Sequence, residues 1–197
     1  MTFSRAGGYY NRMKIESLWN SFKKVIWLVL VIWAVFLLSR FFPSVNDHGI
    51  VPRTVAGLPG ILFAPFLHAG LVHIAGNTAG LLAMGFFMTV LDDDRLFYTL
   101  VPIVLIGGLG TWIIGRSGSN HLGASGMIFG MLGYLLASGF FRREIRSIVV
   151  SVLVFVLYGS MLMGVFPILP EVSWESHLCG FCAGVLTASG SRSIKRK

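Results

Sequence analysis

Apolar residues gather into six stretches along the chain, and short polar or charged segments separate them. Most stretches approach the length of about 20 residues that a helix needs to cross roughly 30 Å of hydrocarbon. The pattern therefore predicts an all-α membrane protein, built as one bundle of six transmembrane helices without a separate soluble domain. The predicted spans are 25–42, 73–91, 96–114, 123–141, 147–166 and the shorter 177–189.

The segment 42–72 departs from this pattern, because prolines punctuate it and charged residues interrupt it. Its apolar part, Ile61 to Leu67, is far too short to cross a bilayer. We expect this part to lie in the membrane interface or to dip into the bundle. The prolines of the segment are Pro43, Pro52, Pro59 and Pro65.

Composition supports a membrane protein, since 55% of the 197 residues are hydrophobic, only 12% are charged and the mean hydropathy is +0.77. Soluble domains contain about 25% charged residues. We divide the chain into a loosely ordered basic tail at 1–24, a core at 25–190 and a second basic tail at 191–197. The first apolar stretch is long and lacks a small-residue cleavage site, which favours an anchor over a signal peptide.

Positive charges are distributed unevenly between the two sides of the predicted bundle. Six spans place both termini on one side, and that side holds all of the 16 Lys and Arg residues except Arg40, Arg53 and Arg116. Loops rich in Lys and Arg stay in the cytoplasm. The distribution therefore predicts cytoplasmic termini, and it accounts for the net charge of +8 without a nucleic-acid partner.

Polar side chains recur at one depth of alternate spans. The spans 73–91, 123–141 and 177–189 all run from outside to inside, and each carries such a residue near its outer start. His73 and Asn77 are four residues apart and share one face of the first of these helices. The other two polar residues at this depth are Ser125 and His177.

Two pairs of glycines indicate which of these helices meet. Gly126 and Gly130 lie on the span 123–141, and Gly180 and Gly184 lie on the span 177–189. Pairs of small residues four apart let membrane helices approach closely. Because His177 lies on the same stripe as the second pair, contact between the two stripes would drive His177 toward Ser125.

A serine and a histidine brought together in this way can perform nucleophilic acyl transfer. The imidazole takes the hydroxyl proton as a general base, and donors then stabilise the oxyanion of the tetrahedral intermediate. His73, the Asn77 amide and the Ser125 backbone N–H are the candidate donors. The outer halves of the predicted spans contain no carboxylate, so we expect a Ser–His dyad without a third member.

Three motifs in these spans resemble those of the rhomboid intramembrane serine proteases. Residues 123–126 match the GxSG motif, residues 73–77 match HxxxN, and residues 177–184 match HxxGxxxG, in the family's order and spacing. The preceding run 66–73 also resembles the family, with His68 as its extra histidine. Each motif is weak alone, but their occurrence on alternate spans is highly specific.

The resemblance implies a rhomboid-like six-helix fold and an endopeptidase that cleaves transmembrane segments of membrane proteins near their extracytoplasmic end. Ser125 would be the nucleophile, His177 the general base and acid, and His73 with Asn77 the oxyanion hole. The span 147–166 and the loop 167–176 would be the lateral gate and cap. The family further implies the inner membrane of a bacterium and no cofactor or metal. The supporting residues would be Gly123, Gly126, Phe129, Gly180 and Gly184.

Two departures from the family's pattern concern residues around the predicted dyad. Phe129 stands where many members have a tyrosine that packs on the catalytic histidine, so the ring can stack but its hydroxyl is absent. The aromatic–arginine pair that many members carry in the first outer loop is not evident. Neither departure removes a member of the dyad.

Other interpretations remain open on the sequence. A catalytically inactive rhomboid-like chaperone or binding protein would keep the fold without needing Ser125 and His177. A transporter or channel would spread polar groups through the depth of the bilayer. Cys179 and Cys182 are expected to pack between helices rather than bind a metal. Asp92, Asp93 and Asp94 are expected to form a solvated cytoplasmic turn rather than a cation site. No oligomeric state is predicted. The three remaining histidines, His48, His68 and His121, are expected to be structural or exposed.

Overall fold

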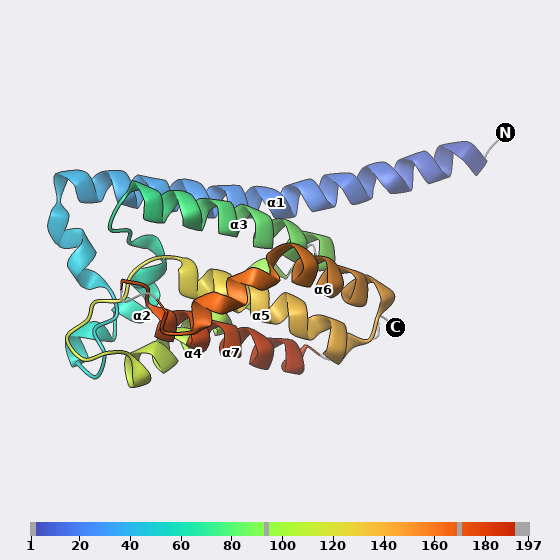
Figure 1. Ribbon diagram of the computed structural model, residues 1–197. Coiled ribbons are helices and arrows are strands. Elements are labelled where there is room, and N and C mark those ends of the chain that lie inside the picture. Colours follow the sequence, from blue (N-terminus) through green and yellow to red (C-terminus); the bar gives the residue numbers. More distant parts are fainter. Residues whose placement is uncertain (1–2, 93–94, 169–170, 192–197) are drawn as a thin grey trace.

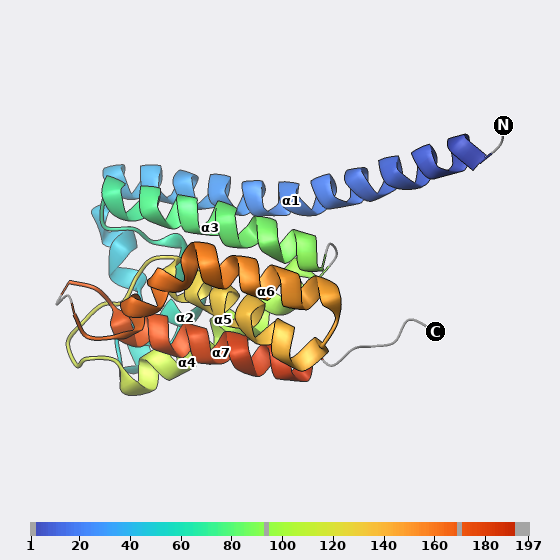
Figure 2. The same cartoon turned by 45° about the vertical axis from the view of Figure 1, so that its right-hand side comes forward.

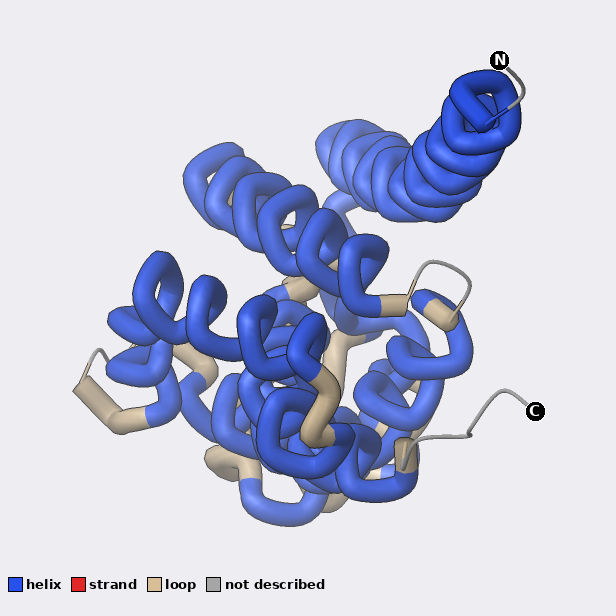
Figure 3. Tube along the Cα trace, turned by 90° about the vertical axis from the view of Figure 1, so that its right-hand side faces the viewer, coloured by secondary structure: helices blue, strands red, loops and turns tan. Residues whose placement is uncertain are grey.

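The computed structural model describes residues 3–92, 95–168 and 171–191, with side chains from position 15 onward. The described residues form helices and loops, and the one β-type pairing among them is an isolated bridge between Ile50 and His121. Figure 3 shows this all-helical arrangement with the long helices seen nearly end-on. The predicted all-α fold class is therefore confirmed.

The helices fall into six long ones and several short turns. The long helices are α1 (Phe3–Phe41), α3 (Leu71–Leu91), α4 (Leu96–Ile114), α5 (Ser125–Arg142), α6 (Ile145–Tyr158) and α7 (Trp174–Gly190). The short elements are η1 (Pro43–His48), η2 (Val55–Gly57), α2 (Gly60–Phe63), η3 (Ala64–Phe66) and η4 (Gly159–Val165). The segment 42–72 thus contains only short helical pieces before α3, as its prolines predict.

Four described helices are long and apolar enough to cross a membrane, and they are Ile15–Phe41, Leu71–Leu91, Leu96–Ile114 and Ile145–Val165. They establish an integral, multi-pass membrane protein. α5 and α7 are 18 and 17 residues long and are rich in glycine, alanine and serine. Because these two helices do not meet the same criterion, the count of six spans stays a prediction.

The long helices lie side by side, and α5 occupies the middle of the bundle (Figures 1 and 2). α5 packs most extensively against α7, and it also contacts α6, α4 and α3. α1 begins and α7 ends at one end of the bundle, whereas α2 lies at the opposite end, beside the starts of α5 and α7 (Figure 1). We call these the inner and outer ends.

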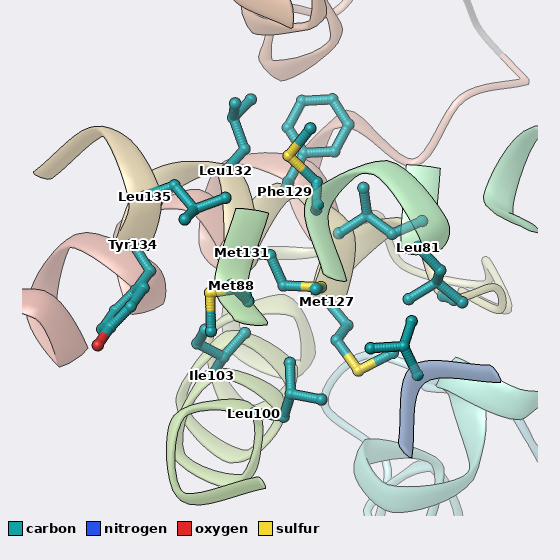
Figure 4. Packing of buried hydrophobic residues seen from close by; sticks show 14 of the residues in the cluster. Leu81, Met88, Leu100, Ile103, Met127, Phe129, Met131, Leu132, Tyr134 and Leu135 are labelled. Carbon is teal, nitrogen blue, oxygen red and sulfur yellow. The ribbon is translucent and has the colours of Figure 1, made fainter. Parts of the chain in front are cut away.

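Large apolar side chains fill the centre and the inner part of the bundle. Figure 4 shows side chains from α3, α4 and α5 converging, among them Met88, Ile103 and Met131. All three are almost completely buried. At the inner end, the Tyr134 hydroxyl and Arg142 both donate to the Asp92 carboxylate. This ion pair joins the end of α3 to the end of α5.

Three details differ from the sequence-based expectations. The segment 1–24, expected to be loosely ordered, is helical from Phe3, because α1 continues without a break past the inner end of the bundle. The last helix begins at Trp174 rather than at His177, so it includes a turn that was assigned to a loop. Asp92, expected to lie in a solvated turn with Asp93 and Asp94, is paired with Arg142 instead, while Asp93 and Asp94 lie outside the described residues.

Candidate active site

Ser125 is the first residue of α5, at the outer end of the bundle. The chain reaches it through Gly123, whose φ of +114° is one that residues with a Cβ rarely adopt. A Cβ on Gly123 would lie 2.5 Å from Nε2 of His73 and 3.2 Å from Nδ2 of Asn77. The glycine therefore allows both side chains to lie against the backbone just before Ser125.

His68 connects these groups, although it was expected to be only structural or exposed. Its side chain is buried between η3 and α3, and its ring centroid lies 5.0 Å from that of His73. Nε2 of His68 lies 2.9 Å from the Asn77 amide nitrogen and accepts a longer hydrogen bond of 3.5 Å from the Ala124 N–H. His68 thus orients the Asn77 amide beside the start of α5.

Burial, with a smaller effect from His73, lowers the pKa of His68 to about 4. The ring is therefore neutral at physiological pH, which leaves Nε2 free to accept hydrogen bonds. Nδ1 lies 3.4 Å from the carbonyl oxygen of Phe66 and can carry the remaining proton. The position of His68, five residues before His73 in the same sequence run, was the signal available for this role.

His177 lies in the second turn of α7, and two contacts hold its ring. Nδ1 lies 2.9 Å from the carbonyl oxygen of Gly164, at the end of η4. The ring stacks on Phe129 with centroids 4.1 Å apart and an angle of 6° between the planes. A proton on Nδ1 can be donated to Gly164, so Nε2 remains as the nitrogen available to act as a base.

Glycines bring α5 and α7 into backbone contact at this depth. A Cβ on Gly180 would lie 1.9 Å from the carbonyl oxygen of Gly126, and one on Gly184 would lie 1.9 Å from that of Gly130. The two stripes of small residues therefore meet. Phe129, which stacks on His177, is one turn of about 5.4 Å along α5 from Ser125. His177 and Ser125 consequently both lie at the outer end of the contact between α5 and α7.

The described residues contain no hydrogen bond between the Ser125 hydroxyl and His177. Hydrogen bonds of this kind are often long or poorly aligned before a substrate binds. The structure therefore brings together the two helices that carry these residues, without a direct hydrogen bond between the two side chains.

A small pocket of about 40 Å³ adjoins Ser125 and is lined by residues of α4, α5, α7 and the η3 turn. This volume is enough for a water molecule, which needs roughly 10–15 Å³ of such space. The Ser125, Ser176, Thr111 and His121 side chains belong to its lining and provide polar groups. Water can therefore be held beside Ser125 within an otherwise apolar bundle.

The first outer loop, residues 42–70, is fixed by groups that the family pattern did not indicate. Arg53 Nη1 donates to the carbonyl oxygens of Ile113 and Gly115, at 2.7 and 2.9 Å. The indole N–H of Trp112 donates to the Thr54 carbonyl at 2.9 Å. An aromatic residue and an arginine thus anchor the loop to the end of α4, although they come from different positions in the sequence.

Cys179 and Cys182 are free thiols in α7. A Cβ on Gly110 would lie 3.0 Å from the Cys179 sulfur, so this thiol packs against α4. The described residues contain no group of three or more His, Cys, Asp or Glu side chains that could hold a metal ion.

Comparison with known proteins agrees with the three sequence motifs. A family model described as the rhomboid domain matches residues 55–192. The chain is 41% identical over 182 residues to an uncharacterized protein of Mycobacterium tuberculosis, covering 88% of this chain and 76% of that protein. It is 29% identical over 179 residues to the candidate rhomboid protease YdcA of Bacillus subtilis, covering 82% and 85%.

A plant relative is similar over a shorter stretch. RHOMBOID-like protein 4 of Arabidopsis thaliana is 34% identical over 142 residues, which cover 69% of this chain and 35% of that protein. The match to the family model extends from the first outer loop to the end of α7 and includes all three motifs. The chain therefore belongs to the rhomboid family.

Proposed function

We propose that this protein is an intramembrane serine endopeptidase with Ser125 as nucleophile and His177 as general base. Its substrates are membrane proteins, and cleavage falls near the extracytoplasmic end of a transmembrane segment. The observation that carries the proposal is the stacking of His177 on Phe129, one helical turn from Ser125, where glycines join α5 to α7.

In the first half of the reaction, the Ser125 oxygen attacks the carbonyl carbon of the scissile peptide bond. The hydroxyl proton passes to Nε2 of His177, and the carbonyl oxygen becomes an oxyanion. His73, the Asn77 amide and the Ser125 N–H donate to this oxyanion. The intermediate then expels the amine, which takes the proton from His177, and an ester between the substrate and Ser125 remains.

In the second half, water from the pocket beside Ser125 attacks the ester carbonyl while His177 accepts its proton. Collapse of the second tetrahedral intermediate returns the proton to the Ser125 oxygen and releases the carboxylic acid product. His68 keeps the Asn77 amide nitrogen turned toward the start of α5 through both halves. Preorganised donors of this kind act without reorganisation during the reaction.

The proposal includes a topology in which α5 and α7 also cross the membrane and both termini are cytoplasmic. Arg142 stays paired with Asp92 at the inner end, so neither charge faces hydrocarbon alone. The site then lies below the outer surface of the bilayer. A substrate helix has to unwind locally to reach Ser125, because its backbone must leave its own hydrogen bonds.

The decisive experiment measures cleavage of a model transmembrane substrate in detergent, together with labelling by a fluorophosphonate. Wild-type protein should cleave and be labelled, whereas Ser125→Ala and His177→Ala should lose at least about a thousandfold in rate, as other Ser–His hydrolases do. Equal labelling of wild type and Ser125→Ala would reject the assignment of Ser125 as the nucleophile. A folded wild-type protein that binds the substrate without cleaving it would instead favour the inactive, chaperone-like alternative.

A further inference from the structure

Glu175 is a buried carboxylate that the reaction described above does not use. It lies in the first turn of α7, two residues before His177, and its side chain is only 1% exposed. Oε1 forms an ion pair with Nε of Arg116 at 2.8 Å, and neither carboxylate oxygen has a hydrogen bond of good geometry among the described residues. Burying a carboxylate in this way is costly, so this residue calls for an explanation beyond packing.

The partner of Glu175 comes from the segment 115–124, which leads into Ser125 and which we call the serine loop. Arg116 pairs with Glu175 and also donates through Nη2 to the Val172 carbonyl, at 3.1 Å. One guanidinium thus contacts the chain on both sides of the N-terminus of α7. The serine loop is thereby tied to the helix that carries His177.

A second group of contacts repeats this connection a few residues further along the serine loop. His121 is buried, and its Nδ1 contacts the Ser173 hydroxyl just before α7. Nε2 of His121 lies 2.8 Å from the Ser119 hydroxyl. Ser173 in turn donates to Ser176 at 2.8 Å, within the first turn of α7. Polar contacts therefore join the serine loop and the start of α7 at two points.

These contacts bear on the geometry of the dyad. The serine loop ends at Ser125, the first turn of α7 leads into His177, and the described residues contain no direct hydrogen bond between the two. Their separation therefore depends on how the two segments are held relative to each other. A misplacement of about 1 Å can cost a hundredfold in rate.

We propose that Glu175, paired with Arg116, is a positioning residue that holds the start of α7 against the serine loop and so sets the approach of His177 to Ser125. The inference rests on the proposed protease function. Glu175 acts through these two segments and touches neither the substrate nor the reacting atoms. Its loss should slow the chemical step and leave the binding of substrate helices unchanged.

The test compares Glu175→Gln with wild type in transmembrane-substrate cleavage and in the rate of fluorophosphonate labelling. Glutamine keeps the shape of the side chain and removes the charge. We expect kcat and the labelling rate to fall at least about tenfold while KM stays within about twofold, which assigns the loss to the reacting geometry. Glu175→Asp keeps a carboxylate and should recover part of the rate.

Arginine variants provide the matched control. Arg116→Lys keeps the charge but loses the two-sided contact, so it should resemble Glu175→Gln. Arg53→Lys weakens a similar clamp, which joins the first outer loop to the end of α4 and to Gly115 and Ser117 of the serine loop but does not contact α7. This variant tests whether the contact with α7 matters rather than anchoring of the serine loop in general, and its kcat should stay near that of wild type. Thermal unfolding of each variant separates a lost fold from a lost rate.

The outcomes separate the two proposals. Wild-type kcat in Glu175→Gln, with Ser125→Ala inactive, would overturn the positioning role and leave the protease intact. The positioning role would also be overturned if kcat of Glu175→Gln fell only together with its thermal stability and Arg53→Lys showed the same fall in kcat. Retained cleavage in Ser125→Ala would overturn the proposed function itself.

Discussion

α5 is flanked by two helices that are held very differently. Against α7 it makes backbone contacts at Gly180 and Gly184, and a Cβ at either position would lie 1.9 Å from a carbonyl oxygen of α5. α6 is more exposed, because only 11% of an apolar 18-residue stretch within Ile145–Val165 is buried, compared with 44% of the corresponding stretch of α3. Its contact with α3 includes the edge of Phe87 against Tyr158, with centroids 6.1 Å apart.

This difference separates two tasks that one bundle has to perform. Chemistry needs side chains fixed within fractions of an ångström, and the α5–α7 contact supplies that rigidity. Admitting a substrate helix from the bilayer needs an element that moves at low cost, and α6 has few contacts with α3 to break. We propose that the substrate enters between α3 and α6.

The largest effect should come from adding a side chain in the backbone contact between α5 and α7. Gly180→Val would push a side chain into the Gly126 carbonyl, and no rotamer change relieves a clash with backbone. We expect the free energy of unfolding to fall by more than about 2 kcal/mol and fluorophosphonate labelling to disappear. Gly190→Val, on the same helix but in open space, is the control for helix propensity. Wild-type labelling of Gly180→Val would show that this contact is softer than its geometry indicates.

Removing the ring that supports His177 should have the next largest effect. Phe129→Ala eliminates the stacked contact, and an aromatic pair of this kind contributes about 0.5–1.5 kcal/mol beyond its buried area. The labelling rate should therefore fall by up to about tenfold. Phe129→Tyr keeps the stacking and should stay within about twofold of wild type. A large gain in Phe129→Tyr would mean that the missing hydroxyl limits the rate.

Weakening the contact between α3 and α6 should raise the cleavage rate rather than lower it. Phe87→Ala removes the ring contact between α3 and α6, so substrate helices should reach the site more readily. We expect cleavage of a transmembrane substrate to rise by about two- to threefold, the equivalent of roughly 0.5 kcal/mol, with unchanged labelling by a small fluorophosphonate. Leu186→Ala, at an exposed position of α7, serves as the control. A parallel fall in both rates would argue against entry at this place.

The smallest effect concerns the contact between α3 and α5 at the outer end. His68 has a pKa of about 4 in the folded protein and about 6.5 when unfolded. The unfolded chain therefore binds the extra proton first as pH falls. Stability should be constant above about pH 6.5 and decline between about pH 6.5 and 4. Thermal unfolding against pH should show this decline in wild type and a flatter curve in His68→Gln.

The sequence predicted the parts of the site that depend on periodicity and spacing. Ser125 and His177 lie where two glycine stripes were expected to meet, because small residues four apart mark one helix face regardless of the rest of the fold. The prolines of residues 42–72 likewise exclude a span, and only short helices are found there. The catalytic roles themselves remain proposals for the experiments above.

Residues defined by long-range partners were not predictable in this way. Glu175 looked like a loop residue, because nothing near it in sequence shows that α7 begins at Trp174 or that Arg116 lies opposite. Asp92 looked solvated because Arg142 is 50 residues away. The role of His68 could not be predicted because it depends on the Ala124 N–H, which lies beside it only in the folded chain. Each of these roles depends on a partner that only the folded chain brings close.

The sparse burial of α6 has a consequence for the environment in which this protein works. Most of that helix is solvated by acyl chains, so the energy of displacing it includes the work of rearranging lipid. The rate at which substrates reach the site then depends directly on the thickness and lateral packing of the membrane. The same polypeptide should turn over at different speeds in thin and thick bilayers, even with its reacting groups unchanged.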